Sequence, residues 1–194
     1  MRIVGGEFKG RTLKAPRSDA IRPTSDRTRE SLFNILSLAY PGSVDGARVL
    51  ELFAGTGAVG LEALSRGAKS AIFVDNSVEG RALIQSNIEA LGLTGRTKIF
   101  RRDAAALGLC RGLDPYGLVF ADPPYGKGLG EKALDNASRD GWIAEGALVM
   151  LEERSDQSPT LGRSFFPLES RVFGETSIHF YRHQAGRRDH EPRQ

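Results

Sequence analysis

From residue 48 to residue 153, short apolar segments alternate with longer segments whose apolar residues recur at helical spacing. The strand-like segments read RVLELF, SAIFVD, TKIFRRD, LVFAD and ALVMLEE, and between them lie GAVGLEALSRG, SVEGRALIQSNIEALGL, AAALGLC and GEKALDNASRDGWI. Strands joined through helices form right-handed crossovers, which build a mostly parallel sheet with helices on both faces. After Glu153 the alternation stops, and SFFPLESRVFGETSIHFYRH predicts two strands joined by a glycine-containing turn. We expect an α/β fold with a mostly parallel seven-stranded sheet and an antiparallel C-terminal hairpin at its edge.

The bulk properties narrow the class of protein. The 194 residues are one domain of ordinary size, and 40% hydrophobic with 26% charged residues is a globular composition. No apolar run approaches the roughly 20 residues that a membrane span needs, and the N-terminus has no signal-peptide hydrophobic region. The single cysteine, Cys110, excludes an intramolecular disulfide. We expect a cytoplasmic monomer with no membrane partner.

The N-terminal segment carries most of the excess positive charge. Residues 1–30 hold eight Lys and Arg against four Asp and Glu, whereas the whole chain has a net charge of only +3. The stretches RIVGG and GRTLKAP predict a small β-hairpin, so we expect a basic extension over residues 1–20, a main domain over 21–183 and a flexible tail over 184–194. Clustered cations suggest a polyanionic partner, although a solvated arm would explain this charge equally well.

A glycine-rich stretch follows the first central strand. ELFAGTGAVG places Gly55, Gly57 and Gly60 in the G-x-G-x-x-G pattern, which is a weak signal by itself. Asp75 ends the next strand, 20 residues after Gly55, where a carboxylate can accept hydrogen bonds from both hydroxyls of a ribose. This arrangement fits NAD and S-adenosylmethionine equally well.

Two further acids favour S-adenosylmethionine over NAD. Glu51 lies inside the first strand, where a carboxylate would suit a cationic ligand such as an amino group or a sulfonium. Asp103 ends the third strand and can accept a hydrogen bond from the exocyclic amine of adenine. Each acid alone could be a helix N-cap, but acids after successive parallel strands face the same crevice.

The stretch VFADPPYGKG carries the most specific chemistry. Asp122 ends the fourth strand, and Pro123 and Pro124 fix the backbone and remove two amide donors. Asp122 and a proline carbonyl then form a pair of acceptors suited to an NH₂ group, and Tyr125 offers a flat face on which a base can stack. Such a site binds the N–H groups of an exocyclic amine and leaves the lone pair of its nitrogen free to attack.

These motifs carry a resemblance that covers residues 1 to about 183. Asp-Pro-Pro-Tyr with ELFAGTGAVGLEALSRGA upstream is similar to the amino-group methyltransferases of the Rossmann-like class I fold. Two N-terminal stretches, MRIVGGEFKGRTLKAP and RPTSDRTRESLFNIL, make the resemblance more specific. With them, the chain resembles the RsmD family, the 16S rRNA (guanine(966)-N(2))-methyltransferases. Glu51 stands where an Asp is more usual in that family.

The resemblance implies a role for each matching residue. S-adenosyl-L-methionine would be the cofactor, 16S rRNA within an assembling small subunit would be the partner, and a helix from Arg27 to Ala39 would cover the cofactor. The implied catalytic residues are Asp122, Pro123, Pro124 and Tyr125. The implied cofactor-binding residues are Glu51, Phe53, Gly55, Gly57, Asp75, Asp103, Thr24, Arg27 and Asn34. The implied RNA-binding residues are Arg2, Lys9, Arg11, Lys14 and Lys127.

Other readings remain open. A DNA adenine-N6 methyltransferase shares the chemistry but usually carries a separate target-recognition segment, and a protein-glutamine methyltransferase usually has Asn in place of Asp122. An NAD-dependent dehydrogenase would not explain Asp-Pro-Pro-Tyr, and a non-catalytic RNA-binding module would not explain the complete pocket. His179 and His183 are four residues apart in a predicted strand, about 13 Å, so we expect no metal site.

Overall fold

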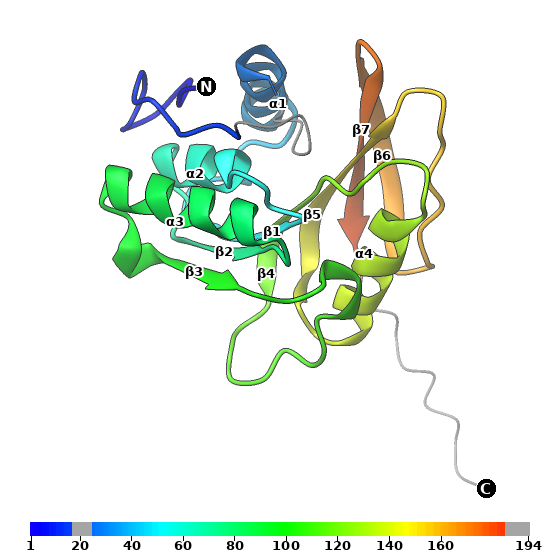
Figure 1. Cartoon of the computed structure of the whole chain (residues 1–194). Coiled ribbons are helices and arrows are strands. Elements are labelled where there is room, and N and C mark those ends of the chain that lie inside the picture. The colour runs from blue at the N-terminus through cyan, green and yellow to red at the C-terminus, as the bar shows by residue number, and fades with distance from the viewer. Residues whose placement is uncertain (17–24, 185–194) are drawn as a thin grey trace, which may run out of the picture.

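The computed structural model describes residues 1–16 and 25–184, and its centre is a seven-stranded sheet (Figure 1). The strand order is β3-β2-β1-β4-β5-β7-β6; β1 to β5 pair in parallel, and β7 runs antiparallel to both of its neighbours. The expected fold is confirmed. The strands are β1 (Arg48–Leu52), β2 (Ser70–Val74), β3 (Thr97–Phe100), β4 (Tyr116–Ala121), β5 (Ile143–Arg154), β6 (Phe165–Phe173) and β7 (Thr176–His183).

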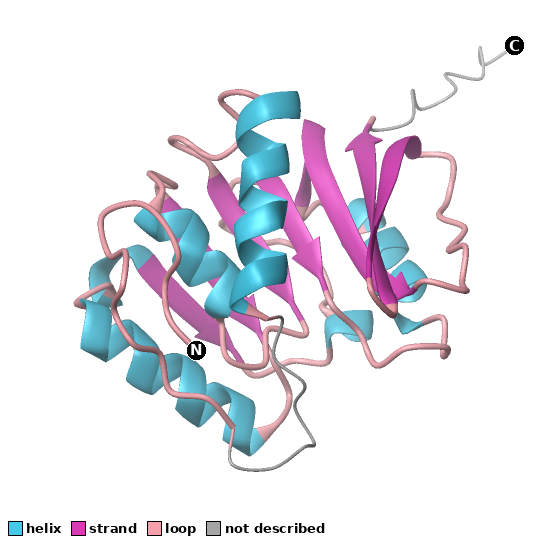
Figure 2. Cartoon of the chain, turned by 90° about the horizontal axis from the view of Figure 1, so that it is seen from above, coloured by secondary structure: helices cyan, strands magenta, loops and turns pink. Residues whose placement is uncertain are grey.

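Helices cover both faces of this sheet, as Figure 2 shows from above. Helices α1, α2 and α3 share one buried cluster with one face of the strands, and α4 with the short 3₁₀ helix η2 shares another with the opposite face. Alternate strand residues supply the two clusters: Val49 faces the first and Leu50 faces the second. The helices are α1 (Asp26–Ala39), α2 (Ala58–Ser65), α3 (Val78–Leu91), α4 (Leu129–Arg139) and the 3₁₀ helices η1 (Thr94–Arg96) and η2 (Ala104–Ala106).

Helix α1 begins where the sequence predicts a start. The side chain of Ser25 accepts a hydrogen bond from the Thr28 backbone N–H at 3.0 Å, which satisfies one of the free donors of the first turn. Leu32, Phe33 and Leu36 form its buried face. The expectations for Thr24 and for a boundary at residues 20 and 21 lie outside the described residues, and so does the expected tail over residues 184–194 apart from Gln184.

Two helices are shorter than the sequence predicts. The helix expected over residues 130–143 ends at Arg139, because Gly141 adopts a positive φ of 83° and Trp142 then turns inward against Tyr116. Ile143 already belongs to β5. The helix expected over residues 104–110 is only the single turn of η2, and Gly108 has a φ of 71° just beyond it.

The N-terminal segment folds back on itself but pairs less than a hairpin would. A single antiparallel bridge joins Arg2 to Thr12, so the two expected strands are reduced to one bridge. Ile3 and Leu13 are buried in the cluster under α1, α2 and α3. Burial of these side chains, together with hydrogen bonds from the segment backbone to Glu62, Ser65 and Asn87, holds the segment against the domain, where Figure 1 shows it in dark blue beside α2.

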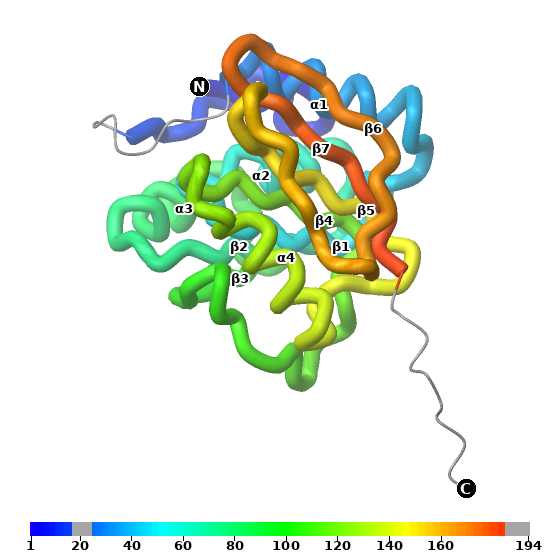
Figure 3. The backbone as a smooth tube through the Cα atoms, turned by 90° about the vertical axis from the view of Figure 1, so that its right-hand side faces the viewer, coloured from blue at the N-terminus to red at the C-terminus, as the bar shows by residue number. Residues whose placement is uncertain are grey.

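The C-terminal hairpin lies at the sheet edge, as the sequence predicts. Strands β6 and β7 pair in antiparallel register from Phe165–His183 to Phe173–Thr176, and Gly174 turns between them with a φ of 64°. Figure 3 shows this side of the sheet facing the viewer, with β7 between β5 and β6. Among the described helices, none combines the length and the apolarity that crossing a bilayer would take.

Candidate active site

A pocket of about 460 Å³ lies at the carboxyl ends of β1, β2 and β4, the edge at which open α/β sheets bind ligands. Its volume is within the range of small-molecule sites. Of the residues expected from the sequence, nine line this pocket together. They are Glu51, Phe53, Gly55, Asp75, Asp103, Asp122, Pro123, Pro124 and Tyr125.

One end of the pocket is built around the loop between β1 and α2, and we call it the glycine-loop end. Gly57 precedes α2 with a left-handed φ of 72°, a conformation that side chains disfavour, so it sets the turn but does not line the pocket. The Gly60 N–H donates to Oε2 of Glu51 at 2.8 Å, and a Cβ at Gly60 would lie 2.6 Å from that oxygen. Gly60 therefore lets a strand carboxylate sit directly against the first turn of α2.

Glu51 is a buried acid in the wall of the glycine-loop end. Only 5% of its surface is exposed, and burial raises its pKa to about 8, although hydrogen bonds from the Gly60 and Val59 backbones and the charge of Arg29 act in the opposite direction. A cation placed in the pocket would favour the ionised form of this carboxyl. The site is thus matched to a positively charged ligand group.

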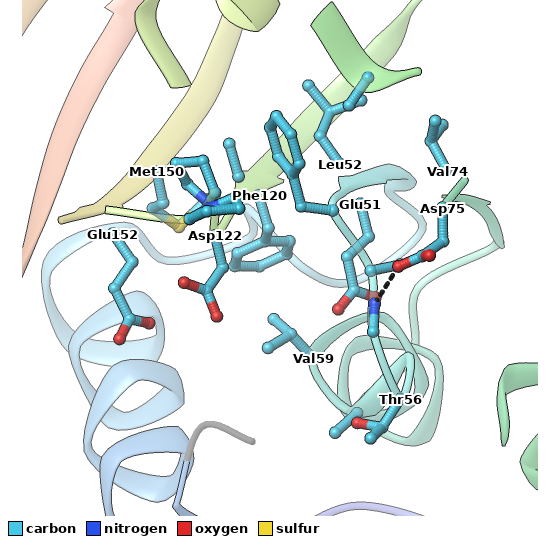
Figure 4. Close-up of a pocket in the computed structure, with 18 of the residues that line it drawn as sticks. Glu51, Leu52, Thr56, Val59, Val74, Asp75, Phe120, Asp122, Met150 and Glu152 are labelled. Atoms are coloured by element: carbon cyan, nitrogen blue, oxygen red, sulfur yellow. Dashed lines mark hydrogen bonds between the residues drawn. The ribbon is translucent and has the colours of Figure 1, made fainter. Parts of the chain in front are cut away.

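Asp75 ties the end of β2 to the glycine loop. Its Oδ2 accepts from the Gly55 N–H at 2.7 Å, drawn as a dashed line in Figure 4, and its Oδ1 accepts from the Ser77 N–H at 2.8 Å. Each carboxylate oxygen can accept more than one hydrogen bond, so this geometry holds the acid in place at the pocket wall. Phe53, at the end of β1, has a φ of +57°, a strained conformation for a non-glycine residue beside a pocket.

The position of Asp103 differs in detail from the prediction. Strand β3 ends at Phe100, so Asp103 does not end the strand. It is instead the N-cap of η2, where its Oδ1 accepts from the Ala105 N–H at 2.9 Å. It is both a cap and a pocket-lining residue. The two readings of such an acid, a helix cap and a ligand contact, are therefore compatible here.

The opposite end of the pocket holds two neighbouring carboxylates, and we call it the acid-pair end. Asp122 follows β4 and Glu152 lies in β5, each one residue beyond the paired residues Ala121 and Leu151. Adjacent parallel strands are about 4.8 Å apart, so the two acids are neighbours. Figure 4 shows both side chains pointing into the same space, and the Tyr125 hydroxyl donates to Oε1 of Glu152 at 2.9 Å.

This crowding of acids has an electrostatic consequence. Burial and the adjacent Glu152 carboxylate raise the pKa of Asp122 well above its ordinary range, while a hydrogen bond from Tyr125 acts in the opposite direction. The Gly126 N–H donates to Glu153 at 3.2 Å, which anchors the loop after Tyr125 to β5. The acid-pair end is therefore rich in acceptors and favours a ligand edge that presents hydrogen-bond donors.

The two prolines differ in their surroundings. Pro123 is buried, and a Cβ built on Gly130 would lie 3.0 Å from its Cγ, so the loop packs closely on the start of α4. Pro124 is exposed at the pocket wall. The turn that the sequence predicts after β4 is thus a rigid connection fixed against α4 and β5.

Comparisons with known proteins agree with this architecture. Residues 1–182 match the family model described as "Conserved hypothetical protein 95". Escherichia coli "Ribosomal RNA small subunit methyltransferase D" is 36% identical over 188 residues, which cover 95% of this chain and 91% of that protein. The chain belongs to the RsmD family.

Two solved structures match over most of the chain. The Escherichia coli protein yhhF superposes with a TM-score of 0.83 at 33% identity, covering 96% of this chain and 99% of that one. A Salinibacter ruber RNA methyltransferase, solved with S-adenosyl-L-homocysteine, superposes with a TM-score of 0.65 at 12% identity, covering 87% and 97%. The second likeness concerns the fold alone, and both place this RsmD-family chain among class I methyltransferase folds.

The helix expected to reach the cofactor contributes differently from the prediction. Arg27 and Asn34 are exposed on α1 and are not among the residues that line the pocket. They are seven residues apart and so share one helix face, whereas Leu32, on another face, lines the pocket. The contribution of α1 to the described pocket wall is apolar.

The residues expected to contact RNA are exposed side chains outside the pocket: Arg2, Lys9, Arg11, Lys14 and Lys127. Arg2 pairs with Asp26 at 3.8 Å, and Arg11 donates to the Ala90 carbonyl at 2.9 Å. Lys127 follows Tyr125 on a different loop. Four of these cations therefore lie on the N-terminal segment, and Lys127 lies beside the acid-pair end.

Sequence reasoning missed five polar wall residues of the RsmD-family pocket: Thr56, Asn76, Ser77, Arg102 and Glu152. Of these, Glu152 lies closest to the Asp-Pro-Pro-Tyr turn, because the Tyr125 hydroxyl donates to it. The same rule that selected Asp75 and Asp122 could have found it, because it is an acid near the carboxyl end of a parallel strand. The rule did not apply directly, because β5 continues to Arg154 and nothing in the sequence fixes which of its residues pairs with Asp122. The register supplies that information.

Proposed function

We propose that this protein transfers a methyl group from S-adenosyl-L-methionine to the exocyclic N2 amine of a guanine in 16S ribosomal RNA. The observation that carries the proposal is the union, in one pocket, of a glycine-loop end matched to a cation and an acid-pair end matched to an amine. The Escherichia coli relative, named as a small-subunit rRNA methyltransferase, supports the choice of substrate.

The residues of the glycine-loop end fit the cofactor. Glu51 would balance positive charge, Asp75 would accept from ribose hydroxyls, and Asp103 would accept from an adenine amine; all three line the pocket. When bound, S-adenosyl-L-methionine supplies a methyl group on a positively charged sulfur that departs as a neutral thioether. The donor is already activated, so the protein is required mainly to position the reactants.

At the acid-pair end, the chain's own groups would act on the amine. A carboxyl oxygen of Asp122 accepts an N–H of the target amine and steadies the positive charge that grows on nitrogen. The proton released from that nitrogen passes to the acid pair or to water. Tyr125, whose hydroxyl donates to Glu152, would present its ring to the base. A base must leave its stack to enter such a pocket.

The exposed cations of the N-terminal segment would hold the RNA backbone. Reversing Arg2, Lys9, Arg11 and Lys14 to Glu should weaken RNA binding and flatten its salt dependence, because each lost phosphate contact removes one counterion-release term. Cofactor affinity, measured by calorimetry, should be unchanged. Unaltered RNA affinity and salt slope in this variant would assign these residues to the solvated surface.

Methyl transfer tests the proposed function directly. Protein and labelled S-adenosyl-L-methionine are incubated with small-subunit rRNA, with partly assembled small subunits and with duplex DNA, and the modified nucleosides are separated and identified. The proposal requires N2-methylguanosine from the RNA. N6-methyladenine from DNA would instead assign the protein to the DNA methyltransferases, and thermal stabilisation by NAD but not by S-adenosylhomocysteine would assign it to a different class of enzyme.

A further inference from the structure

Glu152 is a pocket residue that the transfer of a methyl group does not itself require. Its side chain lines the pocket from β5, the strand next to the one that Asp122 follows. The charge of its carboxylate raises the pKa of Asp122. Figure 4 shows the two carboxylates side by side and directed into the same space. An amine would engage Asp122, and Glu152, whose Oε1 accepts from the Tyr125 hydroxyl, can also accept a hydrogen bond from a second donor on the same ligand.

The identity of that donor follows from the edges that purines present. Guanine carries the N1–H donor directly beside its N2 amine, whereas the N1 atom next to the amine of adenine is an acceptor. An ionised carboxylate offers acceptors only. A second carboxylate beside Asp122 is therefore complementary to guanine, and it meets a lone pair if adenine takes the same place.

We propose that Glu152 determines base specificity by accepting the N1–H of the target guanine while Asp122 accepts from its N2 amine. This inference rests on the proposed function and deepens it. Flipped bases are commonly read by hydrogen bonds along their Watson–Crick edge, and Glu152 is the described residue on β5 whose carboxylate reaches the acid-pair end. Glu153, which follows it, is instead engaged with the Gly126 backbone.

The local contacts hold the side chain of Glu152 in one position. The Tyr125 hydroxyl donates to its Oε1 at 2.9 Å, and Tyr125 is itself part of the Asp-Pro-Pro-Tyr turn packed on α4 and β5. A Gln at this position keeps an Oε1 acceptor for Tyr125 but replaces the other oxygen with an NH₂ donor. Glu152→Gln therefore changes the polarity offered to the base and retains the contact that holds the side chain.

The test compares two bases that share the reacting amine. RNA carrying the target guanine, first mapped with the wild-type protein, is compared with the same RNA carrying 2-aminopurine, which keeps the amine but has an N1 acceptor. Wild-type protein should prefer guanine in kcat/KM. In Glu152→Gln this preference should fall by about 10-fold or more, because a misplaced buried polar partner typically alters discrimination by that order.

A binding measurement accompanies the kinetics. Fluorescence of the 2-aminopurine RNA, titrated in the presence of S-adenosylhomocysteine, should report tighter binding to Glu152→Gln than to wild-type protein. Glu145→Gln is the matched control, since it makes the same change on β5 at an exposed position outside the pocket. It should leave the guanine preference at the wild-type value.

The outcomes distinguish a failure of this inference from a failure of the proposed methyl-transfer function. Equal losses on both bases in Glu152→Gln, with the preference retained, would make Glu152 a structural or proton-accepting residue and overturn the inference alone. A wild-type preference for 2-aminopurine would also overturn it, since a donor would then face N1. A wild-type protein that methylates no guanine in small-subunit RNA would overturn both the inference and the proposed function.

Discussion

The glycine-loop end and the acid-pair end of the pocket are both built from carboxylates, but they hold them in different ways. At the glycine-loop end, Glu51 accepts from the Gly60 N–H and Asp75 accepts from the Gly55 and Ser77 N–H groups. At the acid-pair end, Asp122 lies beside Glu152, and the Tyr125 hydroxyl donates to Glu152. Backbone donors fix the first set, whereas side-chain crowding defines the second.

This difference suggests a division of labour. Acids fixed by backbone amides are preorganised at little cost and suit a ligand that binds in one constant pose. Acids crowded together raise one another's pKa, and growing positive charge on a ligand favours their ionised form, so they suit an amine whose charge grows during reaction. We therefore expect changes at the acid-pair end to alter rate, and changes at the glycine-loop end to alter cofactor affinity.

The largest effect is expected at Asp122. Asp122→Ala removes the acceptor that orients the amine, and loss of one preorganised partner of this kind costs about 10²–10³ in rate. Methyl transfer to small-subunit rRNA is the measurement, with the melting temperature as a folding control. A folded variant that methylates at the wild-type rate would exclude Asp122 from the chemistry.

Tyr125 should have the next largest effect, and two substitutions divide its roles. Tyr125→Ala removes the ring, and base stacking is worth about 1–3 kcal/mol, so the RNA concentration needed for half-maximal rate should rise. Tyr125→Phe keeps the ring and loses only the hydroxyl that donates to Glu152. Its effect should be clearly smaller; equal effects of the two variants would place the function in the hydroxyl.

At the glycine-loop end, Asp75→Ala should weaken cofactor binding by roughly 1–3 kcal/mol through lost hydrogen bonds to the ribose. Calorimetry with S-adenosylhomocysteine measures this change. Ser77→Ala is the matched control, since it removes a hydroxyl that donates to Asp75 at 2.7 Å but keeps the carboxylate. Unchanged affinity in Asp75→Ala would remove the acid from the site.

At Glu51 we expect an effect on cofactor affinity that depends on pH. With a pKa raised to about 8, the empty site holds a proton on Glu51 below that pH, and a bound cation favours its release. Affinity for S-adenosyl-L-methionine should therefore rise with pH by up to about tenfold per unit below pH 8 and level off above it. Titrations from pH 6 to 9 measure the slope. Glu51→Gln should flatten it, and a flat wild-type profile would contradict the assignment.

The two ends also differ in how far the sequence could predict them. The glycine-loop end follows from local sequence, because Gly55 and Gly57 lie in the turn before α2 and Asp75 directly follows the next strand. The acid-pair end could be predicted only at Asp122 and Tyr125, since the partner Glu152 depends on the register of β4 with β5. Arg27 and Asn34 were expected in the site from the helix that carries them, but the side of α1 that faces the pocket is set by packing.

The same contrast holds for the fold. Strand and helix alternation predicts the sheet and its C-terminal hairpin, because both patterns are local and periodic. The N-terminal hairpin and the end of α4 were less predictable. In the first case, burial of Ile3 and Leu13 and hydrogen bonds to α2 and α3 fix the segment. In the second, burial of Trp142 after Gly141 stops the helix. These are tertiary contacts that no local window contains.

One single-turnover titration tests the division of labour most directly. Wild-type protein, Asp122→Ala and Asp75→Ala are mixed with target RNA over a range of S-adenosyl-L-methionine concentrations, so that each gives a plateau rate and a half-saturating concentration. We predict that Asp122→Ala lowers the plateau about 10²–10³-fold with little change in half-saturation, and that Asp75→Ala raises half-saturation with little change in plateau. If each variant changed both quantities to the same extent, the two ends would not be separate working parts, and the account would be contradicted.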